Sequence, residues 1–504
     1  MKGTKVKERL SGLWVCAVAM FAIAPAAAIL VAAGALPTFA AVELGAPFAD
    51  GAVLQRGVKV PVWGTSAPGE TVEVSFAGQT KSAVADAEGR WRVALDPLAA
   101  SKEGRVLRAN GVEAKDVLVG EVWIASGQSN MDCPLWGGNP RYRDGFGALV
   151  GEMTRLPCVR YAKMRHGWSV KPSPAKVTWR KMTADCFRRN SQISAVGFYF
   201  ARELYLALDV PVGIVDASYG GTPIEPWIPR SGYEASKDPL VREIGAMEIR
   251  EKGVWTKERD AKYTMTSEHK QPTVLFNAMV SALVPMAIRG FIWYQGCSNW
   301  DGRGYCAKMH ALLDGWSREF ENPALKLYFA QLASYESNWT DVTAEQDRFV
   351  AEEPRAGMAV ATDLGNYKDI HPNRKEAVAK RLVVHALRRD YGFDIAEDCS
   401  PVFRKAEYRE GAAHLSFDHV KSWYVYSPDR SIEPPFQLAG TNGVWHAAKL
   451  RGVSANGIVT NGVTLVVSSE AVPEPVNVRY LYENQTAGTL YNEVSLPVGP
   501  FKDR

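Results

Sequence analysis

The sequence lacks a surplus of charge of either sign, and this absence excludes one class of partner. Its 504 residues include 59 lysines and arginines and 55 aspartates and glutamates. Four of the basic and one of the acidic residues lie in the first 40 positions, so the remaining chain carries 55 basic and 54 acidic residues. Proteins that bind nucleic acid carry a clear excess of positive charge on the binding face. The composition therefore gives no electrostatic basis for a nucleic-acid partner.

Cysteine is also scarce, and it does not occur in the spacings that hold metals. Cys16 lies in the N-terminal apolar stretch, and the other six are Cys133, Cys158, Cys186, Cys297, Cys306 and Cys399. No CxxC or HExxH pattern is present, so we do not expect a structural zinc site. An even number of cysteines in an exported chain permits disulfides, but the sequence does not choose among the pairings. Six cysteines are too few for a fold held together mainly by disulfides.

Beyond the first 40 residues the chain has no apolar run long enough to cross a membrane. Four basic residues between positions 2 and 9 precede an uncharged apolar stretch that ends in small residues near position 40. This pattern is typical of a secretory signal peptide covering residues 1–40. The stretch is long enough for an uncleaved membrane anchor, but Pro25, Gly34 and Pro37 interrupt it and favour cleavage. We therefore expect a periplasmic or extracellular protein with no stable membrane insertion after cleavage.

Two regions of the chain have the alternating apolar and polar pattern of half-buried β-strands, with turn residues between the strands. Residues 41–116 form the first, and residues 395–504 form the second. We expect each region to be a small all-β domain. Clear strand candidates are Val58–Trp63, Thr71–Phe76, Arg90–Leu95, Val463–Ser468 and Val476–Tyr482.

Between these regions, in residues 117–394, strand patterns alternate with helix patterns. This alternation predicts an α/β domain in which helices cover both faces of a parallel sheet. The predicted strands are Val119–Ala125, Val212–Ala217, Gly290–Tyr294, Lys326–Leu332 and Gly357–Thr362, and the predicted helices are Val196–Leu208, Phe276–Met286 and Lys375–Arg389.

Small, amide and hydroxyl side chains follow four of these strands. The segments are 127–130 (GQSN), 218–222 (SYGGT), 295–299 (QGCSN) and 363–372 (DLGNYKDIHP). Because the carboxyl ends of parallel strands meet at one edge of a sheet, we expect the four segments to lie close together. A serine is a weak nucleophile until a base, usually a histidine oriented by a carboxylate, takes its proton. Backbone N–H groups and an amide can stabilise the oxyanion that forms, and glycines allow close approach of the backbone. The segments therefore supply the groups needed for acyl transfer.

Several motifs spread over most of the chain carry a family resemblance. They are GEVWIASGQSNM, VGFYFAREL, PVGIVDASYGGTPIEPW, FIWYQG, DIHPNRKEAVAKRL and VRYLYENQTAGTLYNEVSLPVGPF. With these motifs the chain resembles the sialate O-acetylesterases, which are SGNH hydrolases with flanking β domains. The resemblance implies a flavodoxin-like SGNH-hydrolase sandwich of three layers. It also implies hydrolysis of O-acetyl esters on carbohydrate, most closely O-acetylated sialic acid, without a metal or a cofactor.

The resemblance also assigns roles to individual residues. Ser129 matches the nucleophile and His371 the base. The oxyanion donors would be the Ser129 N–H, the Gly221 N–H, with Gly220 as an alternative, and the side-chain amide of Gln295. Gln128 and Asn130, on either side of the nucleophile, are expected to bind the substrate.

The acid of the triad is the least certain of these positions. Asp369, two residues before His371, is our candidate. Many SGNH hydrolases place the acid three residues before the histidine, where this chain has Lys368. Asp363 or a backbone carbonyl could orient the imidazole instead.

The chain departs from the family at Cys297, because members usually have WYQGE where this chain has WYQGC. A carboxylate near the expected site is thus replaced by a thiol, which could also pair with the nearby Cys306. Two alternatives to a sialate esterase follow from the sequence. One is an esterase for acetylated xylan, pectin or another polysaccharide, and the other is a carbohydrate-binding protein with weakened catalysis.

Overall fold

The computed structural model describes most of the chain after residue 40. The described residues are 41–135, 146–183, 186, 193–247, 249, 267–337, 339–365, 367–426, 433–482 and 488–503. The expected signal peptide, residues 1–40, lies outside them. Residues 40–504 form one compact unit. Within the described ranges no helix has the length and apolar character needed to cross a membrane.

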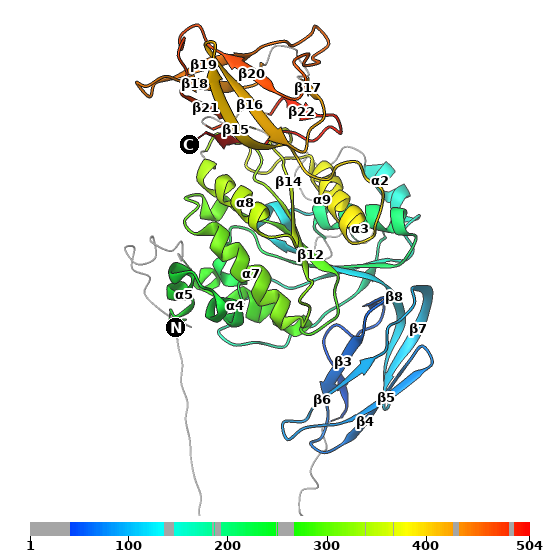
Figure 1. Cartoon of the computed structure of the whole chain (residues 1–504). Helices are drawn as coiled ribbons and strands as arrows, with labels where there is room; N and C mark the ends of the chain where they lie inside the picture. The colour runs from blue at the N-terminus through cyan, green and yellow to red at the C-terminus, as the bar shows by residue number, and fades with distance from the viewer. Residues whose placement is uncertain are drawn as a thin grey trace, which may run out of the picture. The chain divides into compact units, whose positions relative to one another are not determined.

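The N-terminal region is built of short strands, as the alternating sequence predicts, and all of its pairs are antiparallel except β2 with β8 (Figure 1). In β4 and β6 every second residue is buried, so each strand has one face in the core. The strands of this region are β1 (Glu43–Leu44), β2 (Val53–Gln55), β3 (Val60–Thr65), β4 (Thr71–Phe76), β5 (Gln79–Val84), β6 (Arg90–Leu95) and β7 (Ser101–Ala109).

A single long strand, β8 (Val112–Gly127), connects this region to the α/β region. Its first part pairs with β7 and β2, and its second part pairs with the central strands β11 and β12. The boundary that the sequence suggests near residue 116 therefore falls inside a continuous strand. This strand ends two residues before Ser129.

The α/β region contains a large mixed sheet with the order β10-β9-β11-β8-β12-β13-β14. Through β8 the same sheet continues into the N-terminal strands β2, β4, β5 and β7. All neighbours in the order from β10 to β14 are parallel except the edge pair β10 and β9. All seven residues of β11 are buried, because both faces of the sheet are covered. The remaining strands are β9 (Val159–Lys163), β10 (Arg180–Lys181), β11 (Val212–Ser218), β12 (Gly290–Tyr294), β13 (Lys326–Ala330) and β14 (Ala356–Ala359).

Helices α3 and α9 pack together on one face of this sheet, and α7 and α8 lie on the other (Figure 1). Helix α3 begins where the Ser194 hydroxyl accepts a hydrogen bond from the Gly197 N–H, and it ends at Asp209 in a left-handed conformation. The helices are α1 (Ser129–Asp132), α2 (Phe146–Met153), α3 (Ala195–Leu208), α4 (Arg230–Ala235), α5 (Pro239–Gly245), α7 (Tyr305–Glu319), α8 (Thr340–Glu352) and α9 (Lys375–Arg389).

One predicted helix, Phe276–Met286, is helical but not a regular α-helix, and it ends before residue 284. Residues 276–286 form a π-helical turn, η5 (Phe276–Val280), followed by the 3-10 turn η6 (Ser281–Leu283). Val284 is extended, because the ring of Pro285 disfavours the helical conformation in the residue before it. Other short 3-10 turns are η3 (Glu225–Trp227), η4 (Glu268–Lys270) and η7 (Cys297–Asn299).

The C-terminal region is all β, as predicted, and has its own hydrophobic core, which includes Trp423, Phe436 and Tyr480. Its main sheet has seven antiparallel strands, and β17 pairs with β22 in a second sheet. The strands are β15 (Val402–Arg409), β16 (Ala412–Asp418), β17 (Trp423–Val425), β18 (Phe436–Ala439), β19 (Trp445–Leu450), β20 (Leu465–Ser468), β21 (Asn477–Tyr480), β22 (Leu490–Asn492) and β23 (Phe501–Lys502).

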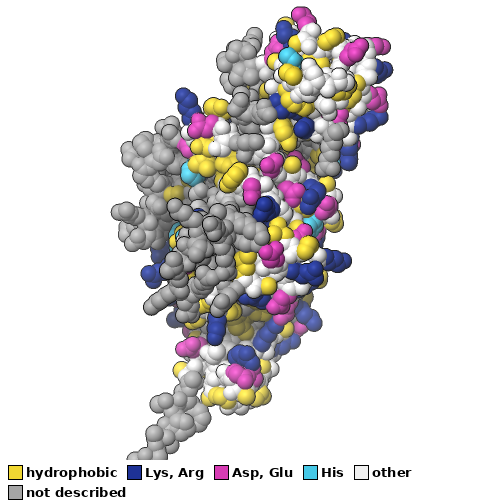
Figure 2. Space-filling view, turned by 90° about the vertical axis from the view of Figure 1, so that its left-hand side faces the viewer, with side chains coloured by type: hydrophobic (Ala, Val, Ile, Leu, Met, Phe, Trp, Pro, Cys, Tyr) yellow, Lys and Arg dark blue, Asp and Glu magenta, His cyan; other side chains and the backbone are white. Residues whose placement is uncertain are grey.

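The surface shown in Figure 2 mixes basic and acidic side chains over its visible face. This mixture agrees with the near balance of charge in the sequence after position 40. The described cysteines form no disulfide, and Cys297 and Cys306 are separate thiols.

Candidate active site

The nucleophile loop begins where β8 ends, at Gly127. This residue has a φ of 135°, and a Cβ atom there would lie 2.3 Å from the Tyr294 carbonyl oxygen. Only glycine fits this tight junction between β8 and β12. The chain then turns through Gln128 into the short helix α1, whose first residue is Ser129.

His371 meets Ser129 although 242 residues separate them in the sequence. The His371 Nε2 atom lies 2.8 Å from the Ser129 Oγ atom, a hydrogen-bond distance. The His371 side chain is 39% exposed, so the pair can be reached from solvent. The structure thus brings together the two residues on which the expected chemistry depends.

Asp369 lies beside His371 but does not hold it tightly. One carboxylate oxygen accepts a hydrogen bond from the His371 backbone N–H at 3.0 Å and lies 3.9 Å from the ring Nδ1 atom. The second distance is that of an ion pair and is too long for a hydrogen bond. The alternative carboxylate, Asp363, is held by Arg381 through two hydrogen bonds of 2.7 Å. Asp369 therefore remains the better candidate for the acid.

The double glycine of the loop after β11 packs against the nucleophile. A Cβ atom on Gly220 would lie 3.5 Å from the Ser129 Cβ atom, and the Gly220 N–H donates to Asp132 at 3.3 Å. Gly221 has a φ of 72°, and its N–H makes no hydrogen bond to any described residue. Of the two glycines, Gly221 is therefore the one whose N–H is available to a ligand.

Gln295 is placed differently from the expectation. Its side chain is fully buried, and its amide nitrogen donates to the Thr222 carbonyl at 3.2 Å and to the Asn299 Oδ1 atom at 2.9 Å. The Asn299 amide in turn binds both carboxylate oxygens of Glu225, which pairs with Lys308 at 2.8 Å. No hydrogen of the Gln295 amide is left for an oxyanion, which argues against the predicted role. Gln295 instead joins the loops after β11 and β12.

Gln128 and Asn130 are also buried, 3% and 2% exposed. The Gln128 side-chain oxygen accepts hydrogen bonds from the N–H groups of Gly296 at 3.1 Å and Ser298 at 3.3 Å. The Asn130 amide donates to the Ile370 carbonyl at 3.1 Å. Both side chains therefore hold the Ser129 loop to its neighbours, and their contact with a substrate stays a prediction.

Comparisons with known proteins identify the family of the chain. Residues 119–383 match the sequence model of the family described as carbohydrate esterase, sialic acid-specific acetylesterase. The chain belongs to this family.

Relatives cover most of the chain. Sialate O-acetylesterases from Rattus norvegicus and Homo sapiens are 27% and 26% identical to it, over 71% and 81% of this chain and 75% and 81% of their own. The crystal structure of a carbohydrate acetylesterase from Xanthomonas citri is similar with a TM-score of 0.76 and 30% identity. That similarity covers 92% of this chain and 100% of the other.

The esterase has a buried lysine beneath the Ser129–His371 pair that sequence reasoning missed. Lys375, the first residue of α9, is 2% exposed and donates a hydrogen bond to the Asn130 Oδ1 atom. Its ammonium group lies 5.1 Å from the centre of the Tyr294 ring. Burial lowers the pKa of Lys375 to about 8. A lysine four residues after the base, in a sequence rich in lysine and arginine, gave no signal that it is buried.

The position that departs from the family, Cys297, lies next to this lysine. Burial raises the pKa of the Cys297 thiol to about 12, while Asn130 and the charge of Lys375 act weakly in the other direction. The thiol is therefore uncharged at neutral pH. His371 is affected too, because burial and the charge of Lys375 both lower its pKa. A neutral imidazole is the form that can accept a proton from a serine.

A second buried network supports the glycine loop. Lys163 bridges Asp132 at 2.7 Å and Asp216 at 2.9 Å, and His166 lies 3.4 Å from Asp132. Burial alone would raise the pKa of Asp132, but the hydrogen bond from His166 and the charge of Lys163 lower it to about 2. Asp132 is thus a carboxylate that holds the Gly220 N–H beside the nucleophile. The spacing of these residues in the sequence gives no sign of the network.

Two groups of side chains in the described part of the esterase have metal-binding donor atoms within 4.8 Å of one another. They are Cys306, His310 and Glu352, and Glu397, Cys399 and His419. Each group already contains a histidine–carboxylate pair, at 3.2 Å and 3.0 Å respectively. Neither group includes Ser129 or His371, so a metal held there would not touch the reacting atoms.

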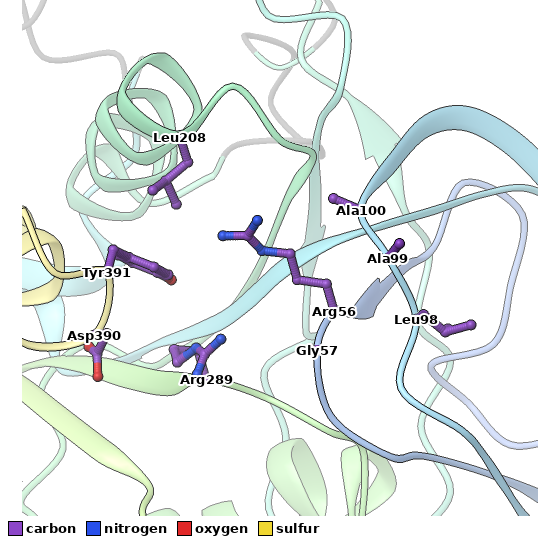
Figure 3. A pocket seen from close by; sticks show the side chains of 9 residues that line it. All are labelled: Arg56, Gly57, Leu98, Ala99, Ala100, Leu208, Arg289, Asp390 and Tyr391. Atoms are coloured by element: carbon purple, nitrogen blue, oxygen red, sulfur yellow. The ribbon is translucent and has the colours of Figure 1, made fainter.

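A cavity of about 470 Å³ lies at the opposite edge of the sheet (Figure 3). Arg289, which lines it, directly precedes β12, whereas the catalytic loop follows that strand. Arg56 lines the cavity as well. Both arginines pair with the buried Glu121, Arg56 at 2.6 Å and Arg289 at 3.3 Å. The cavity shares no residue with the Ser129 site, and its charges are mutually satisfied.

Proposed function

We propose that this carbohydrate esterase is a serine hydrolase in which Ser129 is the nucleophile and His371 the general base. The observation that carries the proposal is the 2.8 Å contact between the Ser129 Oγ and His371 Nε2 atoms. Geometry of this kind allows a histidine to take the serine proton as the hydroxyl attacks a carbonyl carbon. Asp369, beside the other ring nitrogen, would favour the imidazolium that forms.

The reaction follows in two halves. Attack of the Ser129 oxygen on the acetyl carbonyl gives a tetrahedral oxyanion, which the N–H groups of Ser129 and Gly221 would hold. His371 then gives its proton to the sugar oxygen. The sugar alcohol departs, and the acetyl group stays bonded to the Ser129 oxygen. Water, activated by the same histidine, releases acetate and restores the serine.

The strand order supports the SGNH type of sandwich. Five of the parallel strands have the order β11-β8-β12-β13-β14, and a further parallel strand, β9, lies beyond β11. In chain order the five are 2-1-3-4-5, the flavodoxin-like arrangement, whose ligands bind at the carboxyl ends of the strands. Ser129 follows β8, the strand at which the order reverses.

We propose O-acetylated sialic acid as the substrate, since the curated relatives are named sialate O-acetylesterases. Trp300, 62% exposed in the loop after β12, offers an aromatic face on which a sugar could stack. The Xanthomonas citri relative is described only as a carbohydrate acetylesterase. An acetylated polysaccharide such as xylan is therefore the second candidate. We also propose export through the basic and apolar segment of residues 1–40.

The proposal is tested with the purified protein and 4-nitrophenyl acetate. Turnover is expected in the wild type and should be lost in Ser129→Ala, whereas equal rates would remove Ser129 as the nucleophile. Acetate release from O-acetylated sialic acid and from acetylated xylan, measured side by side, identifies the substrate. Binding heat with these glycans but no acetate release would instead indicate a binding protein.

A further inference from the structure

The ammonium group of Lys375 has no carboxylate partner among the described residues. The side chain is 2% exposed, and its hydrogen bond goes to a neutral amide, that of Asn130. A buried cation without a counter-ion is costly, and proteins rarely keep one without a function. The arrangement therefore calls for an explanation beyond packing.

Among the described residues, the groups around the Lys375 ammonium include no carboxylate that pairs with it. Helix α1 contributes Asn130, with Cys133 just beyond it, strand β12 contributes the Tyr294 ring, and turn η7 contributes Cys297. The remaining titratable neighbour is His371, in the loop that leads into α9. Asp369, 3.9 Å from the His371 Nδ1 atom, is the negative charge that faces the imidazole from its own loop, and the charge of Lys375 acts on the ring in the opposite direction.

Lys375 is also linked to His371 through a chain of hydrogen bonds. It donates to the Asn130 side-chain oxygen, and the Asn130 amide donates to the Ile370 carbonyl at 3.1 Å. Ile370 immediately precedes His371. The contacts of Lys375 thus hold the loop that carries the base beside the loop that carries the nucleophile.

We propose that Lys375 is a positioning residue that fixes the His371 loop through Asn130, and that its buried charge, which has no carboxylate partner among the described residues, favours the neutral form of His371. This inference rests on the proposed function. Since a positive charge disfavours a second one nearby, the base stays available at lower pH than an isolated imidazole would.

The sharpest test places a carboxylate where the thiol is. In Cys297→Glu the new carboxylate would pair with Lys375 and cancel its field at His371. The pKa of His371, below its ordinary value of about 6.5 in the wild type, should then rise by roughly 0.5. Cys297→Ser is the matched control, because it keeps the position neutral and should leave this pKa unchanged. Lys375→Met removes the positive charge without adding a buried carboxylate, and it should also raise the pKa of His371.

Two readouts separate this inference from the proposed function. The titration of His371 is followed by NMR in histidine-labelled full-length protein, with His371→Gln identifying its signal among the eight histidines. The acid limb of the kcat/KM profile for 4-nitrophenyl acetate is measured on the same variants. The inference is supported if the NMR titration midpoint of His371 and the inflection of the acid limb of kcat/KM both shift in Cys297→Glu and in Lys375→Met, but not in Cys297→Ser. An NMR shift without any turnover would reject the esterase proposal alone, while turnover with unchanged inflections in both variants would overturn the role of Lys375.

Discussion

Two histidine–aspartate pairs lie near helix α9, and they differ in almost every physical respect. His385 and Asp398 are 2.9 Å apart, and their side chains are 1% and 3% exposed. His371 and Asp369 are 3.9 Å apart, and the His371 ring is 39% exposed. Of the two imidazoles, His371 has a serine hydroxyl within hydrogen-bond distance.

The tighter pair is the structural one. Arg388 and Arg389 contact the Asp398 carboxylate together with His385. Burial alone would raise the pKa of Asp398, but the His385 hydrogen bond and the arginine charges hold it well below its usual range. The looser pair leaves one ring nitrogen for the nucleophile and one edge for a substrate. A short histidine–aspartate distance is therefore a poor guide to catalysis in this chain, and the position of the hydroxyl is the better one.

The largest expected effect comes from replacing each of the two histidines in turn. His371→Gln should lower turnover at least 10³-fold, roughly 4 kcal/mol in the barrier, because the serine loses its base. His385→Gln should keep turnover within a few fold of the wild type while lowering thermal stability. Steady-state rates with 4-nitrophenyl acetate check both variants. A comparable loss of turnover in His385→Gln, in protein that remains folded, would reverse the assignment.

The next effect is the difference between the two aspartates in their contribution to the stability of the folded protein. Asp398→Asn removes a buried charge from two arginines, so the free energy of unfolding should fall by about 3 kcal/mol. Asp369→Asn removes a partly exposed charge and should cost less than about 1 kcal/mol. Urea unfolding at neutral pH measures both. Equal losses would show that the contrast in burial and distance does not govern stability here.

The smallest effect concerns the catalytic carboxylate itself. Because Asp369 lies 3.9 Å from the ring nitrogen, Asp369→Asn should lower kcat about tenfold, near 1.4 kcal/mol. The KM should change little, since the carboxylate is directed at His371. A loss beyond about 10³-fold would mean that the pair tightens during the reaction. An unchanged kcat would indicate that the backbone of the His371 loop, and not Asp369, orients the imidazole.

The sequence was informative where the chemistry depends on local motifs at strand ends. Ser129, His371 and the glycine pair follow predicted strands, so the geometry of a parallel sheet was enough to bring them together. The roles of Gln295, Gln128 and Asn130 could not be predicted in the same way. Their side chains are buried, and the hydrogen-bond partners cited here come from residues 73 to 245 positions away in the sequence.

Lys375 shows the same limit from the other direction. Its neighbours in the sequence are charged and its helix is amphipathic, so the pattern alone suggests a solvent-exposed residue. Its burial arises from the packing of α9 against the loops after β8 and β12, contacts that no local pattern encodes. Likewise, the continuity of β8 could not be inferred from the change of pattern near residue 116, because one strand serves two regions.

The most direct test of the central claim is covalent capture of the nucleophile. A fluorophosphonate probe, with the modified peptide identified by mass spectrometry, should label Ser129 in the wild type, more slowly in His371→Gln, and not at all in Ser129→Ala. Labelling of another serine in wild-type protein that is turning over, or equal rates in the wild type and His371→Gln, would contradict the assignment of Ser129 and His371 as a working pair.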